Sequence, residues 1–142
     1  MKESFDVILF DNDGILVDTE PLFFQATRKI LETVDVPLTV EDYHEISMRR
    51  GGTVFDLAEA RGISRDEIQP LRKVRDRRYS DLIDEGVRIL DGVVETLERL
   101  HGLFPIAIVT TSDRGHFDRI HSQTELIRYF DFVVAQGDYT HH

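Results

Sequence analysis

The chain contains no cysteine, and basic residues are scarce in it. Without cysteine, disulfide bonds, thiolate metal sites and a cysteine nucleophile are all excluded. Seventeen lysines and arginines stand against 27 acidic residues, which gives a formal net charge of −10. Surfaces that bind nucleic acid or anionic membranes need basic patches, so we expect neither partner.

Long apolar runs are also missing. No stretch approaches the ~18 residues that a membrane span needs. The first residues lack a signal-peptide pattern, because Asp6 and Asp11 interrupt any apolar region. We therefore expect a cytoplasmic protein. With 142 residues, 41% of them hydrophobic, the sequence predicts one domain with room for a small added lobe.

The most informative stretch is residues 5–21, FDVILFDNDGILVDTEP. Its apolar run predicts a strand over residues 5–10, covered on both faces as in a parallel sheet. The run stops at Asp11-Asn12-Asp13-Gly14, so two carboxylates follow the end of the strand. In open α/β sheets, ligands bind at the carboxyl ends of strands. Asp11 and Asp13 are therefore the candidate catalytic pair.

The next part of the chain is polar and mostly helical. Pro21 suits the first turn of a helix. Thr39 with Asp42 and Ser64 with Glu67 have the spacing of N-cap pairs, and only the second pair has the glutamate of a full capping box. No strand pattern occurs in this region, so it predicts a helical segment.

Strand and helix patterns alternate again from Gly86 onward. Asp91 is a candidate cap for a short helix, and a second buried strand is expected over residues 105–109. Asp113 can cap a polar helix over about 114–127, and a third strand is expected over residues 130–135. This alternation predicts the α/β class, with a parallel sheet and right-handed crossovers.

Three hydroxyl side chains lie at the carboxyl end of the second predicted strand, namely Thr110, Thr111 and Ser112. Hydroxyls and backbone N–H groups at a strand end can bind an anion. One aspartate of the pair can attack phosphorus while the other moves protons. A Mg²⁺ ion, which prefers carboxylate and carbonyl oxygens, would offset the repulsion between the carboxylates and a phosphate. A plain turn at the aspartates and a plain helix cap at the hydroxyls are the structural alternatives.

These motifs carry a family resemblance. Residues 11–20 closely resemble the first motif of the haloacid dehalogenase-like (HAD) hydrolase superfamily, residues 110–112 resemble its second motif, and residues 130–134 resemble the strand that follows. The resemblance implies a Rossmann-like three-layer HAD core with a parallel sheet, formed by residues 1–18 and 86–142. It also implies an inserted α-helical cap domain, residues 19–85, of the phosphatase and β-phosphoglucomutase-like branch.

The resemblance implies a role for each site residue. Asp11 would be the nucleophile that forms an aspartyl-phosphate, and Asp13 would be the general acid/base. Both would bind Mg²⁺, Asp13 through its backbone carbonyl. Thr110 would bind the phosphoryl group of a small phosphorylated metabolite, such as a sugar phosphate or phosphoglycolate. Arg49 and Arg50 lie where the family has a substrate-specificity loop.

The family also uses a lysine after the third strand and acidic residues at the end of a fourth strand. The lysines here are Lys2, Lys29 and Lys73, and none of them follows a predicted strand. In the family the fourth strand lies beside the first, and without it residues 7–10 would expose an apolar edge. We therefore expect a further C-terminal segment or a dimer partner to cover this edge.

Three other functions compete with the phosphatase hypothesis. A phosphosugar mutase of the same family would return the phosphoryl group to its substrate instead of to water. A non-catalytic, truncated member of the family would keep the fold without the catalytic activity. A receiver-type signalling domain also phosphorylates an aspartate, but the Asp-x-Asp spacing and the helical insertion disfavour it.

Overall fold

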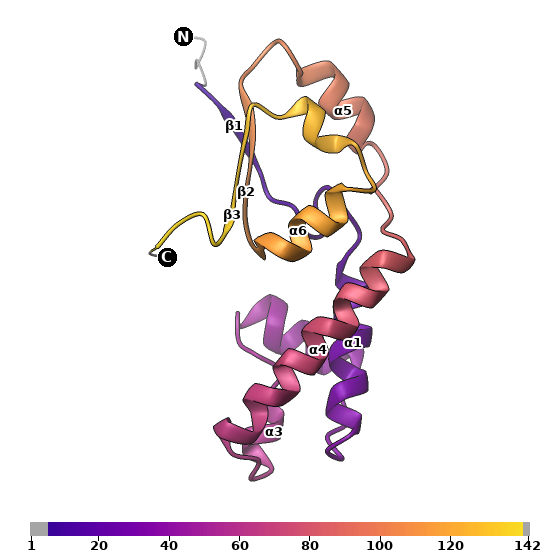
Figure 1. Cartoon of the computed structure of the whole chain (residues 1–142), viewed down its shortest axis with the longest axis vertical. Coiled ribbons are helices and arrows are strands. Elements are labelled where there is room, and N and C mark those ends of the chain that lie inside the picture. Colours follow the sequence, from indigo (N-terminus) through magenta and orange to yellow (C-terminus); the bar gives the residue numbers. More distant parts are fainter. Residues whose placement is uncertain (1–5, 141–142) are drawn as a thin grey trace. The chain divides into compact units, whose positions relative to one another are not determined.

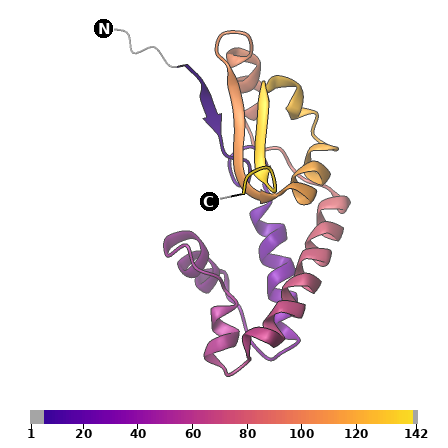
Figure 2. The ribbon, with the colours of Figure 1, turned by 60° about the vertical axis from the view of Figure 1, so that its left-hand side comes forward.

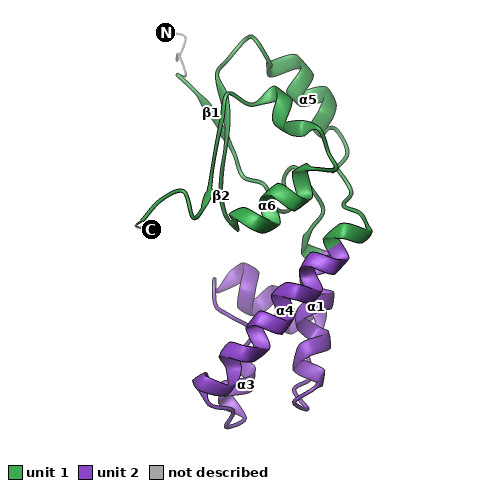
Figure 3. Ribbon diagram, in the orientation of Figure 1, with its two compact units in different colours: residues 1–20, 83–142 green, residues 21–82 purple. Residues whose placement is uncertain are grey.

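A computed structural model describes residues 6–140 (Figure 1). The chain divides into two compact units (Figure 3). The core unit comprises the described residues up to Glu20 and those from Ile83 onward, and the inserted unit comprises Pro21–Leu82. The sequence pattern places these junctions near residues 18 and 86.

The core unit is built on a three-stranded parallel sheet in the order β1-β2-β3. The strands are β1 (Ile8–Phe10), β2 (Ile106–Asp113) and β3 (Phe132–Gln136). Ile8 pairs with Ile106 in the register of β1 and β2. The predicted parallel sheet is confirmed, and β2 lies at its centre.

Strand β2 extends beyond its buried apolar run. It continues through the three hydroxyl residues to Asp113, which are the residues in which the sequence expects the strand to end. Its pairing with β3 shifts register after Val109 and resumes at Asp113, opposite Gln136. The hydroxyl residues therefore lie at the carboxyl end of β2, as expected, and this end of the strand is irregular.

Strand β3 begins two residues later than expected, at Phe132. The side chain of Asp131 explains the difference, because its Oδ2 accepts the backbone N–H of Ile106 at 2.8 Å. The ring of Phe130 packs edge-on against Phe10, with 5.8 Å between the ring centroids. Asp131 also donates its backbone N–H to Ile106 O at 2.8 Å, so both residues anchor the chain just before β3 begins.

Helices α5 (Val93–Leu100) and α6 (Arg114–His121) lie on the same side of the sheet (Figures 1 and 2). Asp113 caps α6 as predicted, because Oδ1 accepts the backbone N–H groups of Gly115 and His116. The predicted cap at Asp91 is wrong, since Gly92, with a φ of 81°, occupies the N-cap of α5.

The predicted helix over 114–127 is also wrong in its second half. Helix α6 ends at His121, and a separate 3₁₀ turn, Leu126–Tyr129, follows. Glu125 between them has a φ of 56°, a left-handed conformation that interrupts a helix.

The side chains on the face of the sheet that α5 and α6 cover (Figure 1) are buried. Ile106 and Ile108 are fully buried there, together with Phe117 and Ile120 of α6. Leu9 of β1 is 57% exposed, as expected for alternating side chains on a strand. The expectation that this strand is covered on both faces is therefore wrong for the described part of the chain. A dimer partner or further segment over β1 stays a prediction.

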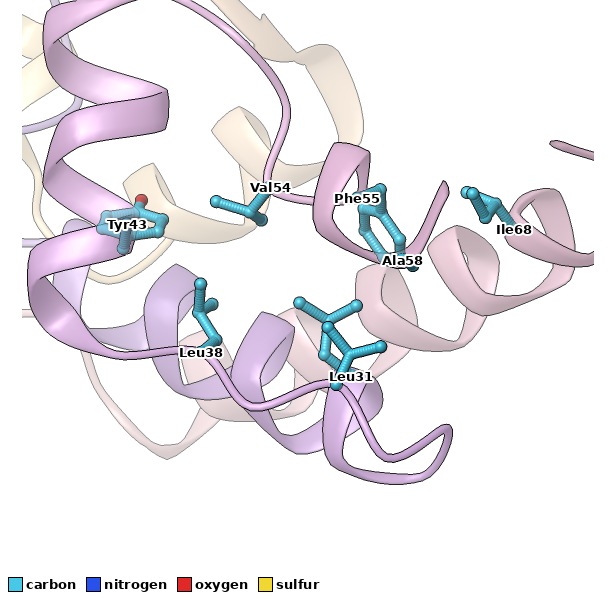
Figure 4. Close-up of a cluster of buried hydrophobic side chains, with 8 residues drawn as sticks. Leu31, Leu38, Tyr43, Val54, Phe55, Ala58 and Ile68 are labelled. Atoms are coloured by element: carbon cyan, nitrogen blue, oxygen red, sulfur yellow. The ribbon is translucent and has the colours of Figure 1, made fainter. Parts of the chain in front are cut away.

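The inserted unit is helical, as predicted. Its elements are α1 (Glu20–Glu32), α2 (Val40–Tyr43), a π-helix (His44–Arg49), α3 (Asp56–Ala60) and α4 (Arg65–Glu85). A cluster of buried apolar side chains holds them together, most of which Figure 4 labels. Its members are Leu31, Val36, Leu38, Tyr43, Val54, Phe55, Ala58 and Ile68.

Both predicted N-cap pairs form in this unit. Thr39 Oγ1 accepts the backbone N–H of Asp42 at 3.0 Å, and the Asp42 carboxylate accepts the N–H of Thr39 at 3.4 Å. Ser64 and Glu67 make the same reciprocal contacts. The expectation that only the second pair is a full capping box is wrong, because an aspartate at this position reaches back as a glutamate does. Across residues 6–140, every helix is too short or too polar to cross a membrane.

Candidate active site

The turn after β1 is held by backbone hydrogen bonds. Asn12 O accepts the N–H of Leu16 at 2.9 Å, and Gly14 N donates to Val17 O at 2.9 Å. Gly14 has a φ of 73°, and a Cβ added there would lie 3.0 Å from Glu20 Oε1. The turn therefore needs glycine both for its backbone conformation and for this close approach.

Asp13 is fixed by hydroxyl groups from two parts of the chain. Thr19 Oγ1 donates to Asp13 Oδ1 at 2.6 Å, and Ser112 Oγ of β2 donates to Asp13 Oδ2. Asn12 Nδ2 also lies 3.4 Å from Oδ2. Because each carboxylate oxygen has a donor, the orientation of this side chain is set before any ligand binds.

Asp11 is held less closely. Its Oδ1 accepts the backbone N–H of Asn12 at 2.7 Å, and the residue is exposed. Its Oδ2 has no hydrogen-bond partner among residues 6–140. The two aspartates thus differ, because both carboxylate oxygens of Asp13 accept hydrogen bonds while Asp11 Oδ2 is open.

The three candidate phosphate ligands on β2 have different surroundings. Thr110 is 4% exposed, and its Oγ1 accepts the backbone N–H of Ser112 at 3.1 Å. Thr111 is exposed. Among the described residues, neither Thr110 nor Thr111 donates a hydrogen bond to Asp11 or Asp13. Of the three candidate phosphate ligands, Ser112 is therefore the one that contacts the aspartate pair.

Asn12, His121 and Thr124 form a buried polar network next to the turn, and the sequence does not predict it. His121 Nε2 lies 2.7 Å from Asn12 Oδ1, and His121 Nδ1 lies 2.7 Å from Thr124 Oγ1. Burial lowers the pKa of His121 to about 4, although the negative charges of Asp13 and Asp118 act in the opposite direction. The helical spacing of Phe117 and His121 could have indicated a buried histidine. Nothing in the sequence points to its partner Asn12, in the turn after β1.

Comparison with known proteins identifies the family of the chain. A family model for haloacid dehalogenase-like hydrolases matches residues 8–142. The chain belongs to this family. Its α/β core and helical insertion are those of a HAD-fold protein, so the resemblance seen in the motifs is confirmed.

Phosphatases are among the similar HAD proteins. A phosphorylated carbohydrates phosphatase of Thermotoga maritima is 34% identical over 138 residues, covering 91% of this chain and 60% of that protein. The fructose-1-phosphate phosphatase YqaB of Escherichia coli is 27% identical, covering 100% of this chain and 75% of that protein. A solved haloacid dehalogenase-like protein of Agrobacterium tumefaciens has a TM-score of 0.73 at 28% identity, covering 95% of this chain and 60% of that chain. This HAD chain thus spans about three fifths of the Thermotoga and Agrobacterium proteins.

The donor chemistry at the turn suits Mg²⁺. Asp11 presents carboxylate oxygen, which is the ligand type that Mg²⁺ prefers. Mg²⁺ sites commonly use only one or two carboxylates, with water and substrate phosphate as the other ligands. Within residues 6–140, no cluster of three or more acidic or histidine side chains could hold a metal by itself. Asp11 and the carbonyl of Asp13 therefore fit a Mg²⁺ site that is open to further ligands.

The two candidate substrate arginines lie in the inserted unit. Arg49 Nη1 is 3.1 Å from Glu45 Oε2, and Arg50 Nε is 2.9 Å from Glu45 Oε1. Their side chains are 78% and 71% exposed, so the shared carboxylate leaves them largely in solvent. A role for them in this HAD protein stays a prediction.

Proposed function

We propose that this chain carries the nucleophile and the general acid/base of a Mg²⁺-dependent phosphatase that acts on a small phosphate monoester. The unequal setting of the two aspartates carries the proposal, because Asp13 is fixed through both carboxylate oxygens while Asp11 Oδ2 is open. The names of the Thermotoga and E. coli relatives support a phosphorylated carbohydrate as the substrate.

In the first step, Asp11 Oδ2 attacks the phosphorus atom and the bond from phosphorus to the ester oxygen breaks. Asp13, in its acid form, gives its proton to the leaving oxygen. In the second step, Asp13 takes a proton from water, and the resulting hydroxide attacks the aspartyl-phosphate. This releases inorganic phosphate and restores both aspartates.

The other residues bind and orient the substrate. Asp11 and the backbone carbonyl of Asp13 would hold Mg²⁺, which offsets the repulsion between a carboxylate and a phosphate when it is bound. Thr110 and Thr111 would bind free phosphoryl oxygens through their hydroxyl hydrogens. Ser112, the third predicted phosphate ligand, donates its hydroxyl hydrogen to Asp13 instead. The hydroxyls of Thr19 and Ser112 keep Asp13 in the orientation that proton transfer requires.

Hydrolysis of a chromogenic aryl phosphate, measured with and without Mg²⁺, tests the proposal. We expect Asp11→Asn and Asp13→Ala to lower kcat by at least about a thousandfold, as loss of a nucleophile or proton carrier does. Asp18→Asn is the matched control, because Asp18 follows the same turn but pairs with Arg88 at 2.8 Å. Full activity in Asp11→Asn, or equal losses in Asp11→Asn and Asp18→Asn, would refute the nucleophile assignment.

A further inference from the structure

With Asp13 ionised and His121 neutral, the buried network of Asn12, His121 and Thr124 has one consistent arrangement of hydrogens. The carboxylate oxygen Oδ2 of Asp13 accepts, so the Asn12 group facing it at 3.4 Å is the NH₂ group. Asn12 Oδ1 then faces His121 and can only accept, so His121 Nε2 carries the hydrogen. A neutral imidazole has one N–H, and Nδ1 must therefore be an acceptor.

The far end of the network satisfies the remaining groups. The hydroxyl of Thr124 donates to His121 Nδ1, and Thr124 Oγ1 in turn accepts the backbone N–H of Leu126 at 3.3 Å. Asn12 is fully buried, His121 is 7% exposed and Thr124 is 9% exposed. A buried network in which every group is paired fixes the orientation of its members.

We infer that His121 is a positioning residue for the aspartate pair, acting through Asn12. The Nε2–H of His121 holds Asn12 Oδ1, which directs the NH₂ group of Asn12 toward Asp13. The backbone N–H of the same asparagine holds Asp11 Oδ1 at 2.7 Å. The imidazole of His121 thus fixes the orientation of Asn12, which contacts both aspartates. The catalytic part of this role rests on the proposed phosphatase function.

Replacing His121 with a residue that cannot donate would remove the hydrogen bond to Asn12 Oδ1. Asn12 Oδ1 would be left buried without a partner, which disfavours the present amide orientation. A rotated amide would direct its oxygen at Asp13 Oδ2, where two acceptors repel each other. Glutamine at position 121 can place an amide NH₂ near the position of Nε2, whereas leucine cannot donate.

The first test is independent of activity. In ¹⁵N-labelled wild-type protein, the imidazole nitrogens of His121, identified by their loss in His121→Gln, should show a protonated Nε2 and an unprotonated Nδ1 at neutral pH. The side-chain NH₂ of Asn12 should exchange slowly in the wild type and in His121→Gln, and rapidly in His121→Leu. An Nδ1–H tautomer, a charged ring, or slow exchange in His121→Leu would overturn the inference.

The second test measures kcat and KM with the aryl phosphate. Loss of an outer contact to an active-site ligand typically costs about 10-fold to 100-fold, and we expect this loss in kcat for His121→Leu with little change in KM. His121→Gln should recover most of the rate, and in an Asn12→Leu background His121→Leu should cost nothing further. Ile120→Val, buried on the same helix, controls for loss of packing and should keep the wild-type rate.

The outcomes separate this inference from the proposed function. Equal rate losses in His121→Leu and His121→Gln, or independent effects of the Asn12 and His121 changes, would overturn the positioning role. If the wild-type protein hydrolyses no phosphate monoester, the proposed function fails, and the tautomer and the Asn12 exchange rates still decide whether His121 orients the turn.

Discussion

The buried imidazole of His121 makes stability depend on pH in a predictable direction. Its pKa falls from an ordinary value of 6.5 to about 4, mainly because burial disfavours the charged ring. Between these two values the unfolded chain binds a proton that the folded chain does not. Stability from this group is therefore complete above 6.5 and is lost as the pH falls toward 4.

The magnitude follows from the two pKa values. The full difference corresponds to ~3 kcal/mol, of which ~2 kcal/mol is lost by about pH 5. The groups that face the ring with charge are Asp13 and Asp118, and their attraction for a charged ring is already included in the lowered pKa. A loss of this size is a large fraction of the stability of a typical small domain.

Urea unfolding of the wild type and His121→Gln, followed by circular dichroism at several pH values, measures this effect. Other titrating groups are common to both proteins, so the difference between the two free energies of unfolding isolates His121. We expect the stability of the wild type relative to the variant to decrease by ~2 kcal/mol from about pH 7 to about pH 5. A constant difference, or one that grows in favour of the wild type at low pH, would refute the reasoning.

Three further changes test the structure by thermal or denaturant unfolding. Gly14→Ala should destabilise the core unit by about 1–2 kcal/mol, because a Cβ is strained at a φ of 73°; an unchanged midpoint would contradict the turn geometry. Phe55→Ala should cost about 3–5 kcal/mol, since its ring is 1% exposed within the apolar cluster, while Phe55→Leu should cost clearly less. Thr39→Ala should cost about 1 kcal/mol through loss of its cap, and Thr39→Ser should retain the wild-type stability.

Much of the fold follows from local patterns. Apolar runs followed by polar turns locate the strands, and their alternation with helices predicts the parallel order. The same reasoning expects polar groups at neighbouring strand ends to meet, as Ser112 and Asp13 do. These features are predictable because they depend on the chemistry of a few consecutive residues.

Features set by tertiary contacts are not predictable in this way. The register shift after Val109 breaks the alternation along β2, so the pattern cannot show that Ser112 contacts Asp13 while Thr110 is buried. The helical region after α6 is interrupted by the left-handed backbone of Glu125. A glutamate does not indicate this conformation in the sequence, as a glycine would. His121 and Asn12 are 109 residues apart, and only the packed fold brings them together.

The inserted unit separates the two segments of the core unit along the chain, and this separation affects the order of folding. Pairing Ile8 with Ile106 closes a loop of about 100 residues, and the entropy cost of closure grows with loop length. Within the inserted unit, the rings of Phe23 and Tyr79, near its two ends, lie edge to face with 5.2 Å between centroids. If α1 and α4 associate first, they shorten the loop that the sheet must close. We therefore expect mutations at Phe23 to slow folding as well as to lower stability.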